Sequence, residues 1–336
     1  MNPPSSSSAP YLRLKTPRFS HDNLAFSPYL ENRFALASGS NFGLVGNGRV
    51  HIVDIDPNAP GGSGLRLVRY FETRDCVFDV AWNEQHENHI VAGCGNGAIK
   101  MFDVTLEGLP IQSWHEHSSE IMSIEWNNLN KDQFITSSWD STVKIWTSNR
   151  TTCLITLPSS KPQQLYNATF SPHTPNIVMS CGANGFIDIW DLRMGQGIKS
   201  PTLSISNSPS GSGQMEEVLY CDWNKYDSSL IASASKDGTI NVHDLRSAGR
   251  QGSAKVVGRH DLAARKVFWD PHRREGLASS GYDMTCRVWN INQSTPSPIH
   301  VHSNHTEFVM ALGWSLFDPG LLASAAWDEE VHLYRV

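Results

Sequence analysis

The chain repeats one pattern of apolar and polar positions seven times. Each copy is a short, mostly apolar segment that ends in Trp or Phe and is followed at once by Asn, Ser or Asp. The seven aromatic positions are Phe26, Trp82, Trp126, Phe170, Trp223, Trp269 and Trp314. Most copies lie about 45 residues apart, which is the period of four-stranded propeller blades.

A second pattern keeps step with the first. After each aromatic residue come a strand of small residues, a tight turn and an alternating strand with a large ring near its end, as in FITSSWDSTVKIW at 134–146. Asn and Asp suit the turn because their short side chains bond to its own backbone. The turn residues are Asn96, Asp140, Asn184, Asp237, Asp283 and Asp328, and the rings six residues later are Phe102, Trp146, Trp190, His243, Trp289 and Tyr334. Because two patterns share one period, the sequence predicts an all-β fold, a seven-bladed WD-repeat β-propeller.

The ends of the chain predict how the ring closes. The sequence stops at Val336, directly after the third strand of the seventh copy, so that blade needs a fourth strand. Residues 11–14 alternate in polarity, and we expect them to pair with the seventh blade and remove an exposed sheet edge. Residues 11–336 then form a single propeller. Residues 1–10 are Ser- and Pro-rich and are predicted to be a disordered lead-in.

Two of the intervals between copies are longer than the others. Gly/Ser/Pro-rich stretches occupy 56–66 and 200–214, in the first and fourth copies. Such insertions are tolerated at surface loops. We expect both to be loops that interrupt no strand.

Composition excludes several classes of function. The formal net charge of −6 argues against nucleic acid as a partner, since nucleic-acid binders are usually basic. No apolar run approaches the roughly 20 residues that span a bilayer, so direct membrane insertion is not expected. The N-terminus lacks the apolar core of a secretory signal. The six scattered cysteines indicate a reducing compartment and no structural zinc, and no motif calls for a cofactor.

Three copies contain His, Ser or Thr, Asp and an aromatic residue at the same spacing. The sets are His117, Thr136, Asp140, Trp146; His260, Ser279, Asp283, Trp289; and His305, Ser324, Asp328, with Tyr334 in the last position. One such set alone would suggest nucleophilic catalysis. An active site occurs once per protein, however, whereas this set recurs, so we interpret it as a structural hydrogen-bond network. Neighbouring histidine pairs such as His300 and His302 have no third ligand at a recognisable spacing, so no metal site is expected.

Two sets of positions are expected to gather on the face where the innermost strands begin. One set lies just before the turn acid, where large side chains have no core to fill: Trp139, Lys236, Tyr282 and Trp327. The other set lies at the start of each inner strand. It supplies the acids Asp75, Glu120, Glu216, Glu217 and Glu307, with Phe308, and then Phe78, Met122, Tyr166, Leu219 and Met310, with Arg265 as the exception. Acids from four blades beside large apolar groups suit an amphipathic helix that offers Arg or Lys next to Leu.

Several segments resemble one family in particular. YFETRDCVFDVAWNE (70–84), CDWNKYDSSLIAS (221–233), HTEFVMALGWS (305–315) and AAWDEEVHLY (325–334) are similar to the peroxin-seven family. The resemblance extends over about residues 11–336. It implies a receptor for the N-terminal type-2 peroxisomal targeting signal, Arg-Leu, five residues, His-Leu. It also implies a separate co-receptor, of the peroxin-twenty type in fungal relatives, delivery to the peroxisomal docking machinery, and cycling between cytoplasm and peroxisome.

Two other classes of function are distinguishable from a cargo receptor. A WD-repeat scaffold subunit of a chromatin or ubiquitin-ligase complex would hold a stable partner rather than a transient targeting peptide. A propeller enzyme would need an unrepeated acid–base constellation, and none is visible in the sequence. The sequence therefore favours a binding protein over an enzyme.

Overall fold

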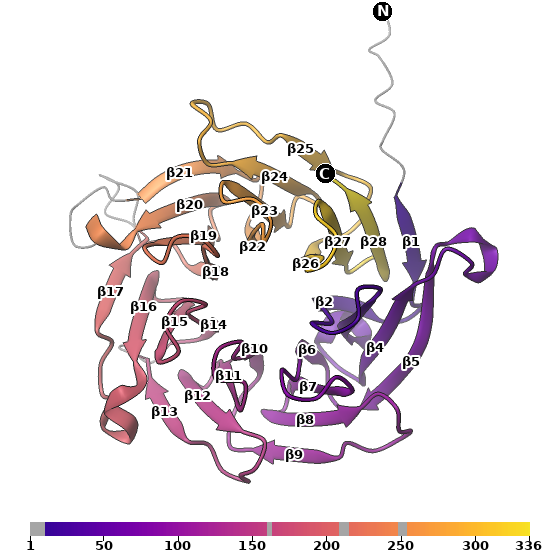
Figure 1. Ribbon diagram of the computed structural model, residues 1–336, viewed down its shortest axis with the longest axis horizontal. Coiled ribbons are helices and arrows are strands. Elements are labelled where there is room, and N and C mark those ends of the chain that lie inside the picture. The colour runs from indigo at the N-terminus through magenta and orange to yellow at the C-terminus, as the bar shows by residue number, and fades with distance from the viewer. Residues whose placement is uncertain (1–10, 160–162, 208–214, 248–253) are drawn as a thin grey trace, which may run out of the picture.

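In the computed structural model, the described residues form 28 strands in seven four-stranded antiparallel sheets around a central channel (Figure 1). The structure describes residues 11–159, 163–207, 215–247 and 254–336. The predicted lead-in at residues 1–10 lies outside these ranges. The seven-bladed propeller predicted from the periodicity is confirmed.

The blades follow one another around the ring, each with its first strand at the channel. Blades 1 to 4 consist of β2 (Ser20–Phe26), β3 (Arg33–Gly39), β4 (Gly48–Ile55), β5 (Leu65–Thr73); β6 (Val77–Trp82), β7 (His89–Cys94), β8 (Ala98–Asp103), β9 (Gln112–His115); β10 (Ile121–Trp126), β11 (Gln133–Ser138), β12 (Thr142–Thr147), β13 (Ile155–Pro158); and β14 (Leu165–Phe170), β15 (Ile177–Gly182), β16 (Phe186–Asp191), β17 (Leu203–Ser206).

The remaining blades have the same order. Blades 5 to 7 consist of β18 (Val218–Trp223), β19 (Leu230–Ser235), β20 (Thr239–Asp244), β21 (Ala254–Arg259); β22 (Ala264–Trp269), β23 (Gly276–Gly281), β24 (Cys286–Asn290), β25 (His300–His302); and β26 (Val309–Trp314), β27 (Leu321–Ala326), β28 (Glu330–Arg335), β1 (Leu12–Lys15). Four short 3-10 helices lie in connections: η1 (Ser40–Gly43), η2 (Pro60–Gly62), η3 (Leu192–Gly197) and η4 (Leu245–Ser247).

The predicted closure by the N-terminal segment is confirmed. Strand β1 pairs antiparallel with β28, with Leu12 opposite Leu333 and Leu14 opposite Val331. The backbone N–H of Thr16 extends the contact by donating to the carbonyl of Glu329 at 2.9 Å. Apolar side chains of blades 7 and 1 also share one buried cluster across this seam. The two ends of the chain are therefore joined by both backbone pairing and packing.

One predicted loop contains a strand. The stretch 200–214 was expected to interrupt no strand, but β17, the outer strand of blade 4, begins at Leu203 and ends at Ser206. Its alternating Leu and Ile pack inward opposite β16, which the Ser-rich composition concealed. Residues 208–214 lie outside the described ranges. The stretch 56–66 holds η2 and the beginning of β5.

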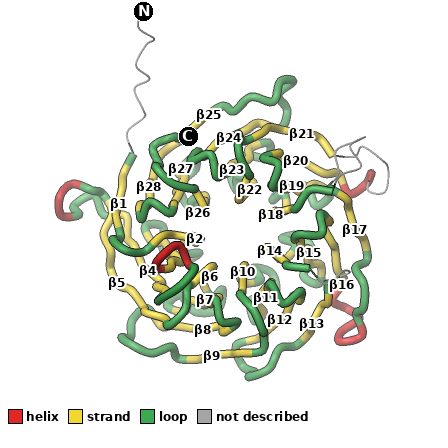
Figure 2. The backbone as a smooth tube through the Cα atoms, turned by 180° about the vertical axis from the view of Figure 1, so that it is seen from behind, coloured by secondary structure: helices red, strands yellow, loops and turns green. Residues whose placement is uncertain are grey.

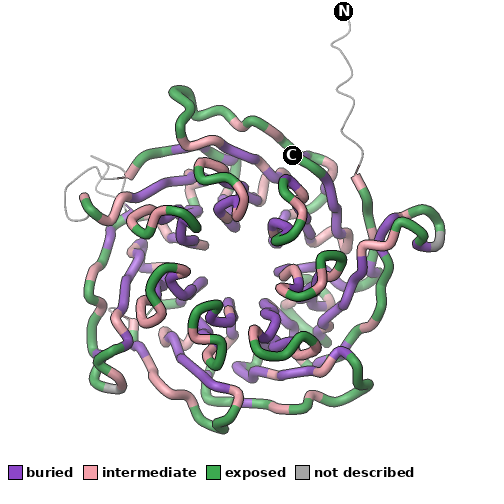
Figure 3. Tube along the Cα trace, viewed as in Figure 1, coloured by how far each residue is buried: buried purple, intermediate pink, exposed green. Residues whose placement is uncertain are grey.

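Burial is concentrated between the blades (Figure 3). Inner and middle strands are mostly buried, and seven clusters of apolar side chains lie between neighbouring sheets. Inner-strand side chains add polar contacts from one blade to the next: Asp79 Oδ2 accepts the Ile124 N–H at 2.8 Å, and Ser123 Oγ accepts the Ala168 N–H at 2.9 Å. The blades thus form one rigid support for the loops on both faces.

A β-bulge occurs at the start of every inner strand. The register shifts by one residue in all seven blades. A bulged residue is left unpaired, and its side chain is re-aimed relative to its neighbours. The bulged residues are Asp22, Phe78, Met122, Tyr166, Leu219, Arg265 and Met310. Six of these are the inner-strand positions singled out from the sequence, and Asp22 is the seventh.

Candidate functional site

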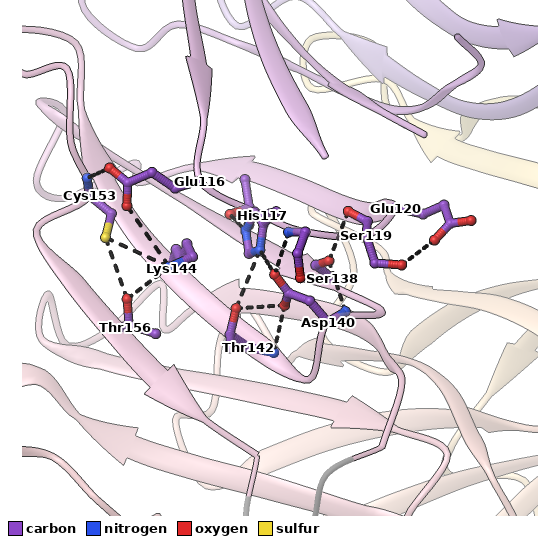
Figure 4. Close-up of polar contacts among 12 residues, drawn as sticks. Glu116, His117, Ser119, Glu120, Ser138, Asp140, Thr142, Lys144, Cys153 and Thr156 are labelled. Carbon is purple, nitrogen blue, oxygen red and sulfur yellow. Dashed lines mark hydrogen bonds and ion pairs between the residues drawn. The ribbon is translucent and has the colours of Figure 1, made fainter. Parts of the chain in front are cut away.

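One hydrogen-bond network recurs in blades 3, 6 and 7. In blade 3, His117 Nε2 lies 2.7 Å from Thr136 Oγ1, and the Trp146 indole N–H donates to the same hydroxyl at 2.8 Å. The other ring nitrogen, His117 Nδ1, lies 2.8 Å from Asp140 (Figure 4). The matching contacts join His260, Ser279, Asp283 and Trp289 in blade 6, and His305, Ser324 and Asp328 in blade 7. We call these the framework residues.

The framework aspartates are held in the ionised form. Burial by itself would raise the pKa of Asp140, but hydrogen bonds from His117, Thr142 and the Ser118 N–H outweigh it and hold the pKa well below its usual range. The pKa of Asp328 is lowered in the same way, to about 2. Each carboxylate ties its own turn to the segment that enters the blade. This arrangement fixes turn geometry and leaves no group free to act on a substrate.

The structure brings together one histidine cluster that the sequence did not indicate. Possible ligand nitrogens of His302, His305 and His332 all lie within 4.8 Å of one another. The His305 and His332 rings, however, are stacked 3.9 Å apart at 13°. A metal ion lies in the plane of each imidazole that binds it, so one ion cannot serve two parallel rings. We therefore interpret this cluster as packing at the blade 7 seam.

A repeated backbone bond joins the two sets of rim positions expected from the sequence. The N–H of Trp139 donates to the carbonyl of Glu120 at 3.0 Å, and the N–H of Trp327 donates to that of Phe308 at 3.1 Å. Lys236 and Tyr282 make the same bond in blades 5 and 6. The turn residue of each of these blades therefore lies beside the start of its own inner strand. We call this surface the top rim; it faces the viewer in Figure 2, with η1 in red.

Four aromatic rings form a continuous arc along the top rim. Tyr282 stacks on Phe308, with centroids 4.7 Å apart and an interplanar angle of 8°. Phe308 lies 5.5 Å from Trp327, which lies 5.4 Å from Phe42. The arc therefore crosses blades 6, 7 and 1. Phe42 is 48% exposed, so the arc presents an apolar surface to solvent.

Phe42 is a rim residue that sequence reasoning missed. It lies in η1, in the first blade's turn, where a longer loop replaces the Asp- or Asn-containing turn of the other blades. Its position depends on Gly43, because a Cβ there would lie 3.2 Å from the Phe78 ring and 3.0 Å from Cys76 Sγ. The Phe78 ring thus continues the arc beneath η1. The large ring in an irregular Gly-rich turn was the available sequence signal.

Asp22 is the second residue that was missed. It is 3% exposed and accepts the Trp327 indole N–H at 3.2 Å from the neighbouring blade. Burial raises the pKa of Asp22 to about 6, an effect that hydrogen bonds from Trp327 and Cys76 oppose in part. Asp22 therefore anchors the central tryptophan of the arc. The position was recognisable as the blade 1 counterpart of the other bulged residues.

The predicted acids occupy the top rim outside the arc, except for Glu307. Asp75, Glu120, Glu216 and Glu217 are half-buried in blades 2, 3 and 5, and Glu307 is exposed beside Phe308 in blade 7. Figure 4 shows Glu120 extending away from the framework network, with its carboxylate bonded to Ser119. The Trp139 indole N–H beside it is buried and has no acceptor among the described residues. The rim is therefore aromatic over blades 6, 7 and 1 and acidic over blades 2, 3 and 5.

Two of the predicted contact residues are less available than expected. Glu217 accepts the Tyr166 hydroxyl at 2.9 Å and forms an ion pair with Lys236, so its charge is already compensated. Met310 is only 6% exposed, so its side chain offers little surface to a partner. Phe78, Met122 and Tyr166 are half-buried and present part of their surface.

Comparison with known proteins matches this geometry to one family. The "WD domain, G-beta repeat" model matches residues 108–147, 203–244 and 255–290. The Saccharomyces cerevisiae peroxisomal targeting signal 2 receptor is 33% identical, over 96% of this chain and 99% of its own length. The chain belongs to the peroxisomal targeting signal 2 receptor family.

Relatives from distant organisms are also similar over most of the chain. Peroxisome biogenesis protein 7 of Arabidopsis thaliana is 35% identical over 94% of this chain, and the Homo sapiens receptor is 33% identical over 89%. The resemblance noted from the sequence is thereby confirmed. The names of the yeast and human relatives describe targeting receptors, not enzymes. Among the described residues, no helix has the length and apolar character needed to cross a bilayer.

Proposed function

We propose that this protein is a cargo receptor that binds the N-terminal type-2 peroxisomal targeting signal as a helix on the top rim. Its relatives are named as receptors for that signal. The observation that carries the proposal is the division of the rim into an aromatic arc and an acidic sector. A helix with Arg and Leu along one side would contact both sectors at once.

The size and spacing of the rim support this mode of binding. A nine-residue signal spans about 13 Å as a helix. Its leucines would pack on the arc of Tyr282, Phe308, Trp327 and Phe42, where aromatic side chains bury large areas at little entropic cost. Its basic side chains would meet Glu120, Glu216 and Asp75. Glu307 lies in blade 7 beside Phe308 and would offer one acid within the aromatic arc.

A co-receptor completes the proposed cycle. A helix lying on a rim leaves its outer side exposed, and a separate protein of the peroxin-twenty type would cover that side. The complex would form in the cytoplasm, deliver cargo to the peroxisomal docking machinery and return. The cargo proteins, the co-receptor and the docking machinery are therefore the expected partners.

Binding of a labelled signal peptide tests the proposal. Fluorescence anisotropy would follow an Arg-Leu-x5-His-Leu peptide, with and without cell extract that supplies the co-receptor. Glu120→Lys and Glu307→Lys should each weaken binding by about 1–3 kcal/mol, because each replaces an attraction by a repulsion. Asp132→Lys, an exposed acid in a loop remote from the rim, is the matched control. Unchanged affinity in both rim variants would exclude this face, and no binding under either condition would favour a scaffold subunit.

A further inference from the structure

The opposite end of the central channel holds a cavity that the proposed cargo site does not use. It has a volume of about 320 Å³ and lies where the inner strands end and the next loops begin. Large rings from several blades line it, among them Phe26, Trp82, Trp126, Trp269 and Trp314. We call this opening the lower mouth. Figure 1 views the ring from this side.

Exposed apolar side chains surround the lower mouth. In four blades the third residue after the inner-strand aromatic is large and exposed: Tyr29 at 38%, Leu129 at 43%, Tyr226 at 49% and Phe317 at 46%. Leu316, which lines the cavity, is 47% exposed. Because these residues recur at one loop position, they form a collar around the channel. Grouped apolar residues on a surface are typical of protein–protein contacts.

The charge inside the lower mouth is mainly negative. Asp79, Glu84, Glu125 and Asp222 line the cavity, and Lys225 is the one basic residue among the described lining residues. Lys225 pairs with Asp222 at 2.8 Å, and Glu84 pairs with Lys131 at 3.4 Å. Asp79 and Glu125 remain without a direct ion pair among the described residues, although the charge of Lys266 partly offsets that of Asp79 and the charge of Lys225 partly offsets that of Glu125.

Those two carboxylates accept backbone bonds instead. Glu125 Oε2 accepts the Phe170 N–H at 2.8 Å, and Asp79 accepts N–H groups of Val80 and Ile124. Within the described part of the chain, neither acid forms an ion pair. Burial raises the pKa of Glu125 to about 7, although a bond from Thr169, the charge of Lys225 and a bond from the Phe170 N–H oppose the shift. A cationic group entering the cavity would offset this burial cost.

We propose that the lower mouth is a second protein-docking surface, which receives an Arg or Lys side chain flanked by apolar side chains of a partner protein. The basic side chain enters the acid-lined cavity, and its apolar neighbours pack on the collar. Charge complementarity selects such a segment over an acidic or purely apolar one. The surface lies at the opposite end of the channel from the top rim, so both can be occupied together. The proposal does not depend on the identity of the cargo.

Fluorescence anisotropy with a model peptide tests the docking surface. The probe is a labelled eight-residue peptide, Leu-Leu-Arg-Leu-Leu-Arg-Leu-Leu, and its control replaces both Arg by neutral citrulline. The full-length double variant Leu129→Ser/Phe317→Ser should bind the peptide about tenfold more weakly, and citrulline should have a similar effect. Because the top rim also suits Arg beside Leu, the probe should keep a second binding component in the top-rim variant Phe42→Ser/Glu307→Lys, and this component should be lost when Leu129→Ser/Phe317→Ser is added to that variant. Circular dichroism melting checks that each variant folds.

Several outcomes would overturn the docking surface. Loss of binding in the top-rim variant alone would assign the peptide to the cargo site. Equal affinity for the Arg and citrulline peptides would show that the acids of the cavity do not recognise the basic side chain. If a second copy of the chain covers the collar instead, sedimentation velocity of the protein alone would show a dimer. That dimer would be absent in Leu129→Ser/Phe317→Ser. Flotation with phosphatidylcholine vesicles, again lost in that variant, would point to a lipid surface instead.

Discussion

Trp327 and Asp328 are adjacent in one turn of blade 7, yet they belong to different parts of the molecule. Asp328 bonds to His305 at 2.9 Å and to the Thr306 N–H at 3.0 Å, contacts that blades 3 and 6 repeat with their own residues. Trp327 packs between Phe308 and Phe42 and bonds to Asp22 of blade 1, contacts that no other described blade repeats. Contacts that repeat from blade to blade therefore identify framework residues, and side-chain contacts that do not repeat identify the rim.

The largest expected effect is on stability when a framework residue is removed. Asp283→Ala should lower the free energy of unfolding by about 3–5 kcal/mol, because it leaves His260 and Arg287 without their buried partner. Tyr282→Ala, at the neighbouring rim position, should lower the free energy of unfolding by less than about half as much, since Tyr282 is only half-buried. Urea denaturation measures both. Equal losses would contradict the division of the turn into framework and rim.

The second-largest expected effect is on binding of the signal peptide. Trp327→Ala should weaken binding of the signal peptide by about 2–3 kcal/mol, because it removes the centre of the aromatic arc. Phe42→Ala, at the end of the arc, should cause a smaller loss. Isothermal titration gives both values, and Leu44→Ala serves as control because Leu44 is exposed in the same turn without arc contacts. A larger loss in Phe42→Ala than in Trp327→Ala would mean that the arc is centred elsewhere.

Acid should destabilise blade 5 through His243. His243 occupies the position of the framework tryptophans, and burial lowers its pKa to about 4. A group whose pKa is lower in the folded than in the unfolded state destabilises the fold once the pH falls below its unfolded pKa. Because of His243, the free energy of unfolding should therefore fall by about 1–2 kcal/mol between pH 6.5 and pH 5.

A single substitution isolates this histidine. His243→Trp places an indole N–H where blades 3 and 6 have one, facing Ser233. The melting temperature of this variant should fall less between pH 7 and pH 5 than that of the unchanged protein. His173→Trp, a change at an exposed histidine outside the framework, should leave the acid sensitivity intact. An unchanged pH dependence in His243→Trp would exclude His243 as a source of acid sensitivity.

The smallest expected effect concerns the acidic sector. Lys236→Met removes the cation paired with Glu217 and should strengthen binding of a basic signal by about 0.5 kcal/mol. The gain should shrink at high salt, because exposed charges are screened. Anisotropy at 50 mM and 500 mM salt measures the difference. Weaker binding in Lys236→Met would show that the lysine itself contacts cargo.

Much of the candidate site could be predicted because it repeats. The framework positions recur at constant spacing, so the roles of His117 and Asp140 could be inferred from His260 and Asp283. The rim positions could be located in the same way, since each lies at a fixed offset from a framework residue. Phe42 and Asp22 were missed because blade 1 departs from the repeat: its turn is replaced by η1 and its inner strand starts with an acid already bonded to Trp327.

The sequence by itself determined the number of blades, the phase of every inner strand and the closure by residues 11–14, because each follows from local patterns that recur along the chain. Only the tertiary structure decided which rim groups are available. Pairing of Glu217 with Lys236, burial of Met310 and packing of Phe42 against Trp327 depend on distances between side chains from different strands or blades. No local pattern encodes such distances, since the twist of the sheets and the bulges set them.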